Sequence, residues 1–198
     1  YDGETHKDEV YTVTYDGTAA TADETGKIFT LSNNDTVTIT ATAEGVKDYD
    51  TSYNENNTYT YVISNASSYS DITANVGTLS IEKASVTLTS EGGDKPYDGT
   101  PLTKPTVAVN GAGATIFQAE VSEIKATGTV TTVAEGEVTN TIVYTEGEKF
   151  KADNYTITKS EGKLKITASE KALVIGSSTK SWMYDGETHK DEVYTVTY

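Results

Sequence analysis

The sequence predicts an all-β fold with at most one short helix. Apolar residues alternate with polar ones in many short stretches, which is the pattern of strands that bury one face. Threonine, valine and tyrosine favour strands and recur in these stretches, whereas proline, which interrupts strands, occurs only 3 times. Helical periodicity is weak, and a short helix is expected only at IFQAEVSEI (116–124).

The expected strands follow one another along the whole chain. Their alternating apolar residues are Val37 and Ile39; Tyr59, Tyr61 and Ile63; Leu79 and Ile81; Val86 and Leu88; Val107 and Val109; Tyr155 and Ile157; and Leu164 and Ile166. One more strand is expected at Ala172–Ile175, and the link KSEG (159–162) is interpreted as a hairpin turn. Strands must cover their apolar face with a second layer, so we expect two-layer, sandwich-like β modules, with a β-grasp-like arrangement as the alternative.

The chain also contains a long exact repeat. Residues 1–15 and 184–198 are both YDGETHKDEVYTVTY, at an offset of 184 − 1 = 183 residues. Identity over such a length is typical of tandem repeats. A third YDG at residues 97–99 divides the 183-residue unit into two diverged parts, because VGTLSIEKASVTLTSEGG (76–93) is similar to EGKLKITASEKALVIGSS (161–178).

These landmarks predict three segments. Residues 1–83 form a first β module that lacks its first strand, residues 84–167 form a second module, and residues 168–198 hold the first strand and YDG entry of the next repeat. Because edge strands seek partners, we expect residues 168–198 to pair with the first module of the same or another molecule. Neighbouring repeats of the chain are therefore its expected partners.

The YDG motif is interpreted as a structural turn. Gly accepts a positive φ, Asp bonds to its own backbone, and the Tyr ring covers the core. The residues in this role are Tyr1, Asp2, Gly3, Tyr97, Asp98, Gly99, Tyr184, Asp185 and Gly186. A fourth copy, Tyr15–Gly17, follows a strand and is expected to be a turn only.

The charge balance argues against nucleic acid and membranes as partners. The formal net charge is −15, and every basic residue is lysine. Phosphate backbones and anionic membranes attract clustered positive charge, so neither is an expected partner. No stretch has the length of an apolar membrane span, and no membrane insertion is expected. Cysteine is absent, which fits a cytosolic protein or a bacterial surface protein without thiols.

No group of residues indicates catalysis. His6 and His189 occupy the same repeat position, and one histidine without partners makes neither a triad nor a zinc site. We therefore expect no enzyme activity, no catalytic residue and no metal ligand. The loops NNDT (33–36) and KDYDTSYNENN (47–57) are rich in oxygen atoms but lack EF-hand spacing, so no cofactor is expected and bound calcium stays an open alternative.

Two tyrosines are candidate ligand-binding residues. Tyr49 and Tyr53 lie in a polar loop, where an aromatic ring is available to a ligand. Tyr59 and Tyr61 share one face of an expected strand, so packing in the core or at its rim is the simpler interpretation. Trp182 lies just before the YDG at residues 184–186 and is expected to pack at a junction between modules.

The second module resembles a known family. KPYDGTPLT (95–103) and NYTITKSEGKLKIT (154–167) are similar to the opening and closing motifs of the YDG and MBG repeat families of large bacterial surface proteins. The first module departs from the pattern, with Glu4 after its YDG and an insertion between its last strands.

This resemblance implies an extracellular protein of a bacterial, Gram-positive cell surface, anchored to the cell wall through other parts of the protein. It implies a stalk or spacer of an adhesin, with no catalytic residues to transfer. The alternative is that the repeats themselves bind mucin, a glycan or a host surface protein. Because such surface modules can carry Lys–Asn isopeptide bonds, Lys165 and Asn154 are kept as a hypothetical pair.

Overall fold

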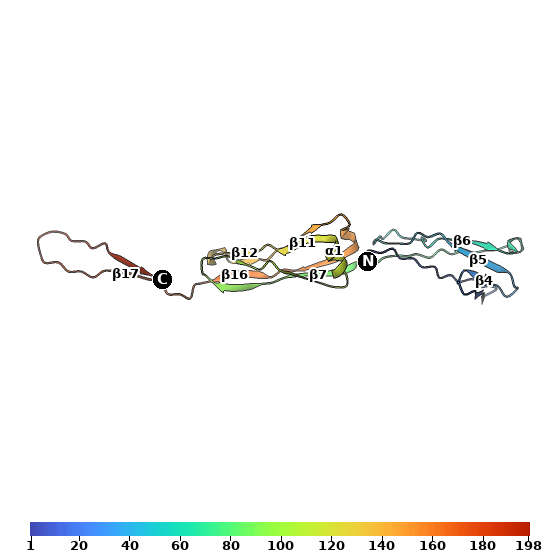
Figure 1. Ribbon diagram of the computed structural model, residues 1–198, viewed down its shortest axis with the longest axis horizontal. Coiled ribbons are helices and arrows are strands. Elements are labelled where there is room, and N and C mark those ends of the chain that lie inside the picture. Colours follow the sequence, from blue (N-terminus) through green and yellow to red (C-terminus); the bar gives the residue numbers. More distant parts are fainter. The chain divides into compact units, whose positions relative to one another are not determined.

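The computed structural model describes residues 1–198 and is mainly β, with 38% of residues in strands and 8% in helices (Figure 1). The predicted all-β fold with one short helix is confirmed. The α-helix α1 spans Ala114–Glu120, and three 3-10 turns complete the helical part: η1 (Ala66–Ser68), η2 (Val133–Glu135) and η3 (Ala152–Asn154). None of these helices is long and apolar enough to cross a membrane.

The chain forms two compact units. Unit 1 comprises Tyr1–Thr87, Val109–Ser122 and Glu146–Thr158, and unit 2 comprises Leu88–Ala108, Glu123–Thr145 and Lys159–Tyr198. The predicted second module, residues 84–167, therefore contributes residues to both units. The predicted module boundaries at 83 and 167 describe the repeat of the sequence, and they stay a prediction.

Unit 1 contains a four-stranded antiparallel sheet with the order β3-β4-β5-β6. Its strands are β3 (Thr21–Ala22), β4 (Ile28–Thr30), β5 (Thr36–Ala41) and β6 (Tyr59–Ile63). Along β5 the alternation seen in the sequence places Val37 and Ile39 on one buried face. These two residues form a core with Phe29 and Leu31, against which Tyr11 and Val13 of the N-terminal segment pack.

Further strands contain residues of both units. The central strand β7 (Ala84–Ser90) lies between β10 (Val107–Asn110) and β15 (Tyr155–Ser160), and β11 (Val121–Ala126) pairs with β14 (Ile142–Glu146). The helix predicted at 116–124 is shorter and earlier than expected. Its C-cap, Val121, is extended and starts β11, because a β-branched residue favours a strand over another helical turn.

The sheet of unit 2 has the order β13-β16-β8. Strand β16 (Lys163–Thr167) pairs antiparallel with β13 (Glu137–Thr139) and parallel with β8 (Gly93–Pro96), while β9 (Leu102–Thr103) pairs with β12 (Thr129–Val130). Leu164 and Ile166 of β16 form a buried core with Val130.

The buried side chain of Asn140 joins three backbone segments of unit 2 by hydrogen bonds. The side chain is fully buried; Nδ2 donates to the carbonyl oxygens of Glu91 and Lys104 at 2.9 and 2.7 Å, and Oδ1 accepts from Gly128 N at 2.9 Å. A buried amide with all three bonds made stabilises one arrangement of the three segments that it joins.

The predicted hairpin at 159–162 is wrong. Strands β15 and β16 flank this link but belong to different sheets, so the chain moves from one sheet to another. Gly162 is not at positive φ; it is needed because a Cβ there would lie 2.3 Å from the carbonyl carbon of Glu91. Spacing between two strands does not reveal this, because pairing partners lie far apart in the sequence.

The strand expected at Leu79 and Ile81 is also absent, although Ile81 is buried. This stretch makes only an isolated bridge, between Gly77 and Asn57, and the side chain of Asn56 bonds to both the N–H and the C=O of Leu79. These contacts involve single residues, so the stretch forms no ladder of consecutive pairs.

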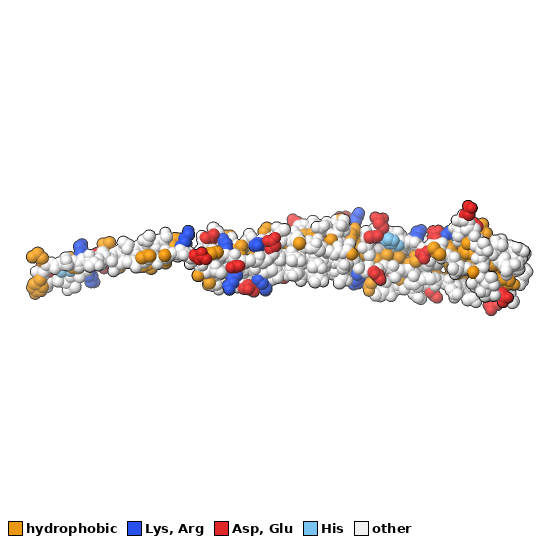
Figure 2. Space-filling view, turned by 90° about the horizontal axis from the view of Figure 1, so that it is seen from below, with side chains coloured by type: hydrophobic (Ala, Val, Ile, Leu, Met, Phe, Trp, Pro, Cys, Tyr) orange, Lys and Arg blue, Asp and Glu red, His pale blue; other side chains and the backbone are white.

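The last elements form an exposed hairpin. Strand β17 (Val174–Ser177), two residues later than expected, pairs with β18 (Tyr194–Thr197) in antiparallel register. Another short hairpin, β1 (Thr14–Tyr15) with β2 (Thr18–Ala19), lies in unit 1. Hydrophobic side chains are visible on the surface of the β17–β18 segment (Figure 2). A two-stranded hairpin that buries so little is marginally stable.

Candidate functional site

Three of the YDG motifs form one and the same turn. Gly3, Gly99 and Gly186 have φ values of +83°, +82° and +83°. In each copy the Asp side chain accepts a hydrogen bond from the backbone N–H two residues later, at 3.0 Å for Asp2, 2.9 Å for Asp98 and 3.0 Å for Asp185. This Asx turn is the local chemistry that the motif predicts.

The fourth copy has a different geometry. At Tyr15–Gly17 both Asp16 and Gly17 have positive φ, 49° and 70°, between the paired strands β1 and β2. Positive φ at both central residues is the mark of a type I′ hairpin turn, which Asp-Gly favours. The strand before this copy therefore decides which turn the same three residues make.

Tyr1 connects the first YDG turn to a buried carboxylate. Its hydroxyl donates to Glu120 Oε1 at 2.6 Å, and the hydroxyl of Tyr155 donates to Glu120 Oε2 at 2.7 Å. The rings of Tyr1 and Tyr155 meet edge to face at 5.5 Å, and Phe150 stacks on Tyr155. Glu120 is a buried residue at the end of α1, so the two hydroxyls supply the hydrogen bonds that its desolvated carboxylate needs.

The same cluster shifts the ionisation of both tyrosines. Burial, and then the hydrogen bond to Glu120, raise the pKa of Tyr1 from 10.0 to about 12. The same two causes, in the same order, raise the pKa of Tyr155 well above 10.0. Both hydroxyls therefore stay protonated at neutral pH and act as hydrogen-bond donors, not as bases.

A neighbouring cluster centres on Asp48. Its carboxylate accepts from Lys151 Nζ at 2.5 Å and from Asn154 Nδ2 at 2.8 Å. These bonds, that of Lys151 first, hold the pKa of Asp48 below its usual value. Both the nitrogen and the oxygen of the Asn154 amide are thus hydrogen-bonded, because Oδ1 also accepts from the backbone N of Tyr49. Lys165, the hypothetical isopeptide partner, is an exposed residue of β16.

The two tyrosines proposed as ligand contacts take part in this loop. The ring of Tyr49 lies under Lys83, with Nζ 4.5 Å from its centroid, and the hydroxyl of Tyr53 donates to the carbonyl oxygen of Asp48 at 3.1 Å. Both tyrosines are half-buried. Their hydrogen bonds and ring contacts order the 47–57 loop, and a ligand would find only part of each ring exposed.

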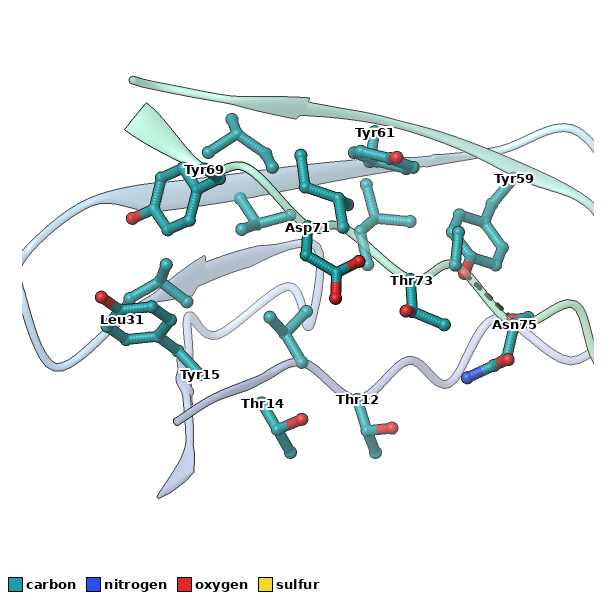
Figure 3. Close-up of a pocket in the computed structure, with 16 residues that line it drawn as sticks. Thr12, Thr14, Tyr15, Leu31, Tyr59, Tyr61, Tyr69, Asp71, Thr73 and Asn75 are labelled. Carbon is teal, nitrogen blue, oxygen red and sulfur yellow. Dashed lines mark hydrogen bonds between the residues drawn. The ribbon is translucent and has the colours of Figure 1, made fainter. Parts of the chain in front are cut away.

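A groove of about 330 Å³ lies elsewhere in unit 1 (Figure 3). It is bounded by the N-terminal segment 12–15, by one face of β5 and β6, and by the segment 69–75. Leu31, Val37 and Ile39, from the core, form its apolar base. Its aromatic residues are Tyr15, Tyr59, Tyr61 and Tyr69.

The tyrosines of the groove are held at fixed angles. Tyr15 and Tyr69 meet edge to face at 5.7 Å, and Tyr59 and Tyr61 are tilted at 6.5 Å. The hydroxyl of Tyr59 donates to Asn75 O at 3.0 Å, which closes one end of the groove (Figure 3). Packed aromatic rings present a rigid apolar surface at little entropic cost.

Polar groups of the groove remain available. The carboxylate of Asp71 points into the open space between Thr73 and Tyr15 (Figure 3), and it forms no hydrogen bond or ion pair with the protein. The hydroxyls of Thr12 and Thr14 on the opposite wall are likewise without a protein partner. An apolar base with a few convergent polar groups is the usual composition of a ligand site.

The sequence did not single out this combination. Asp71, Thr12 and Thr14 follow no motif, and the YDG that contains Tyr15 predicts only a turn. The aromatic density of residues 49–69 is the signal that the sequence does contain, and it favours the loop tyrosines Tyr49 and Tyr53. Two other tyrosines line the groove, Tyr59 and Tyr61, for which the sequence predicts packing at the core or its rim.

Histidine and tryptophan lie outside the groove. His6 Nε2 lies 3.0 Å from Asp2, and His189 Nε2 lies 2.8 Å from Asp185, so the repeated position makes the same contact twice. Trp182 stacks on His189, with centroids 5.3 Å apart and planes at 8°, within the exposed segment that follows β17.

No group of three or more histidine or carboxylate side chains is placed to hold a metal ion. In the NNDT loop, the carboxylate of Asp35 accepts from Tyr69, Asn65 and Ser64, at 2.6, 2.6 and 3.3 Å. The bond from Tyr69 is the largest cause of the lowered pKa of Asp35. The protein's own donors thus occupy the oxygens that calcium would use.

Comparisons with protein-family models, with curated proteins and with solved structures give no match. The resemblance to the YDG and MBG families therefore rests on the motifs of the sequence.

Proposed function

We propose that this chain is a repetitive stalk or spacer segment of a bacterial cell-surface adhesin, which projects a distal binding region from the cell wall. The observation that carries the proposal is a contact that recurs at the YDG turn. Within unit 1 the amino terminus of Tyr1 donates to Glu82 O at 2.6 Å, and within unit 2 Tyr97 N donates to Thr167 O at 2.9 Å, each just before an Asx turn of the same geometry. A structural feature that recurs along the chain is what an array of modules requires.

The composition supports this proposal. Residues 1–15 and 184–198 are identical, which is the mark of a tandem array, and the formal net charge of −15 makes neighbouring molecules repel one another. An acidic, self-repelling surface suits a protein displayed outside the cell in many copies. The chemistry of adhesion would then belong to other parts of the protein.

The test is the length of the array in solution. Chains of one, two, three and four 183-residue units would be compared by small-angle X-ray scattering at physiological salt. A stalk requires the maximum dimension to rise by a constant increment per unit. A rise that follows the square root of the number of units would describe a flexible tether and contradict the proposal.

A second candidate function is favoured by the groove of Figure 3, namely that the repeats bind a glycan, either free or on a mucin or host surface protein. Sugar rings have apolar faces that pack on tyrosine, and their hydroxyls bond to carboxylate and threonine oxygens. Asp71 and Tyr61, which is 39% exposed, are groove residues that such a ligand can reach.

Binding to a panel of glycans and mucins tests this candidate. The variants Asp71→Asn and Tyr61→Ala alter the groove, and the double variant Tyr49→Ala/Tyr53→Ala alters the 47–57 loop. Saturable binding that is lost only in the groove variants supports the glycan function at the groove. Loss only in the double variant moves the site to the loop, and absence of binding to the whole panel removes the candidate.

A further inference from the structure

The hydroxyl groups of Tyr1 and Tyr155 converge on one carboxylate. Each donates to a different oxygen of Glu120, at 2.6 and 2.7 Å, and the two rings meet edge to face with centroids 5.5 Å apart and planes at 78°. Because both hydroxyls point at the same carboxylate, the ring carbons beside them, the ortho carbons, lie on the adjoining ends of two rings in contact. All three residues belong to unit 1, although they lie far apart in the sequence.

Glu120 gives the protons of both hydroxyls a destination. A phenol that loses an electron becomes a strong acid, so oxidation of a tyrosine is easier where a base already accepts its hydroxyl proton. Prior ionisation is not a route at neutral pH, because burial, and then the hydrogen bond to Glu120, raise the pKa of both tyrosines. Electron and proton must therefore leave together, and the two hydrogen bonds to Glu120 provide for this.

The surroundings hold one ring still and leave the other within reach. Phe150 stacks on Tyr155 and Phe117 meets it edge to face, both at 5.5 Å, and Tyr155 is only 4% exposed. Tyr1 is half-buried, and with Glu120 it lines a pocket of about 390 Å³. An oxidant therefore takes an electron from Tyr1 first, and Tyr155 can then pass an electron to Tyr1 through the ring contact.

We propose that Tyr1 and Tyr155 are an oxidative cross-linking site, at which the two rings join through a bond between ortho carbons to form dityrosine. The oxidant is hydrogen peroxide, used by a peroxidase. Each tyrosine gives up one electron and its hydroxyl proton, which Glu120 accepts and releases to water. The two radicals couple, and the hydrogen of each coupled carbon moves to the oxygen of its ring. The protein loses two hydrogen atoms in all, and the peroxide takes them up to give two molecules of water.

The bond would be a covalent link that this chain cannot make in another way. Cysteine is absent, so no disulfide joins distant segments. A link between residues 1 and 155 closes a long loop and restrains the unfolded chain as a disulfide does. It would also fasten the first YDG turn, in residues 1–83, to residues 84–167. The inference rests on the geometry of the three residues and not on the stalk, so either proposal can fail alone.

Other tyrosine pairs in the same unit provide an internal comparison. Tyr11 meets Tyr59 and Tyr15 meets Tyr69, edge to face at 5.5 and 5.7 Å. The buried hydroxyl of Tyr11 has no hydrogen-bond partner, and in the second pair it is Tyr69 that donates to a carboxylate, that of Asp35. Ring contact alone is thus shared by several pairs, whereas a common proton acceptor distinguishes Tyr1 and Tyr155.

Peptide mapping of the oxidised full chain tests the proposal. The protein is treated in dilute solution at neutral pH with hydrogen peroxide and a peroxidase, and is then digested with trypsin. Cleavage after lysine releases Tyr1 in peptide 1–7 and Tyr155 in peptide 152–159, while the repeated Tyr184 lies in peptide 181–190. The main product should join peptides 1–7 and 152–159, lack two hydrogen atoms and show the fluorescence of dityrosine. A product that joins only other tyrosines overturns the proposal.

The repeat supplies a matched control. Tyr1→Phe should abolish this cross-link, whereas Tyr184→Phe, at a position that is 97% exposed, should leave it unchanged. Glu120→Gln keeps an oxygen acceptor but removes the base, so the initial rate of cross-linking should fall about 100-fold, the lower end of what a positioned proton acceptor contributes. Near-ultraviolet circular dichroism checks that this variant is folded; a folded Glu120→Gln protein that reacts as fast as the wild type contradicts the role of the carboxylate. The peptide map and the Tyr1 and Tyr184 variants test the site even if Glu120→Gln does not fold.

Discussion

Replacement of Tyr1 by phenylalanine measures what the hydrogen bond from its hydroxyl to Glu120 contributes to the stability of unit 1. The substitution keeps the ring that meets Tyr155 edge to face at 5.5 Å and removes the hydroxyl that donates to Glu120 at 2.6 Å. A hydrogen bond to a charged group contributes about 1.5–3 kcal/mol. Tyr1 is half-buried and Glu120 keeps its bond from Tyr155, so we expect the lower end, a loss of about 1.5–2 kcal/mol.

The assay is equilibrium urea unfolding in dilute solution, followed by near-ultraviolet circular dichroism of the tyrosines of unit 1. In thermal unfolding the same loss would lower the Tm by roughly 3–8 °C for a chain of this size. Tyr184→Phe is the control, because the same residue in the same local sequence is 97% exposed and forms no hydrogen bond. Its effect should stay within about 0.5 kcal/mol.

Equal effects of the two substitutions would refute this reasoning. They would mean that the contribution of the tyrosine hydroxyl comes from the local YDG turn, which residues 1–3 and 184–186 share, and not from Glu120. A Tyr1→Phe protein as stable as the wild type would likewise show that the buried carboxylate does not depend on this donor.

Three further predictions concern the rest of the molecule. Asn140→Ala should lower the unfolding free energy of unit 2 by about 3 kcal/mol, since it leaves buried backbone groups unpaired; urea unfolding that loses less than half of this would contradict the buried network. Gly162→Ala should cost about 1–3 kcal/mol, because the new Cβ would lie 2.3 Å from the carbonyl carbon of Glu91; an unchanged Tm would refute the close approach. The raised pKa values of Tyr1 and Tyr155 stabilise the fold fully below pH 10.0, and this contribution is lost as the pH rises above 10.0, through about 12 for Tyr1, because unfolded tyrosines ionise first. Tyrosinate absorbance and circular dichroism should therefore change together at alkaline pH, and complete tyrosine ionisation with the fold intact would contradict the cluster.

The short-range features of this protein follow from its sequence. The chemistry of Asp and Gly accounts for the Asx turns at residues 1–3, 97–99 and 184–186, because the Asp side chain and the backbone N–H that it accepts from lie two residues apart; at residues 15–17 the flanking strands make the same residues a hairpin turn. Period-two alternation correctly located strands such as β5 and β16, since it reports which face of a strand is buried.

Strand pairing and the groove could not be predicted in this way. The link at 159–162 looks like a hairpin, yet β15 and β16 pair with strands of different sheets. Asp71 lines the groove because segments 12–15 and 69–75 both lie against β5 and β6, although they are far apart in the sequence. Contacts between segments so far apart depend on how whole sheets pack, which no local pattern records.

The two copies of the repeated segment show which features the local sequence determines and which the tertiary structure determines. YDGETHKDEVYTVTY by itself determines the Asx turn and the contact of His with Asp, because both copies show them. Only the tertiary structure decides that Tyr11 packs on a core while Tyr194 is exposed. The physical reason is that a turn is closed by neighbours in the chain, whereas burial requires a surface such as Phe29 and Leu31 that a distant segment must supply.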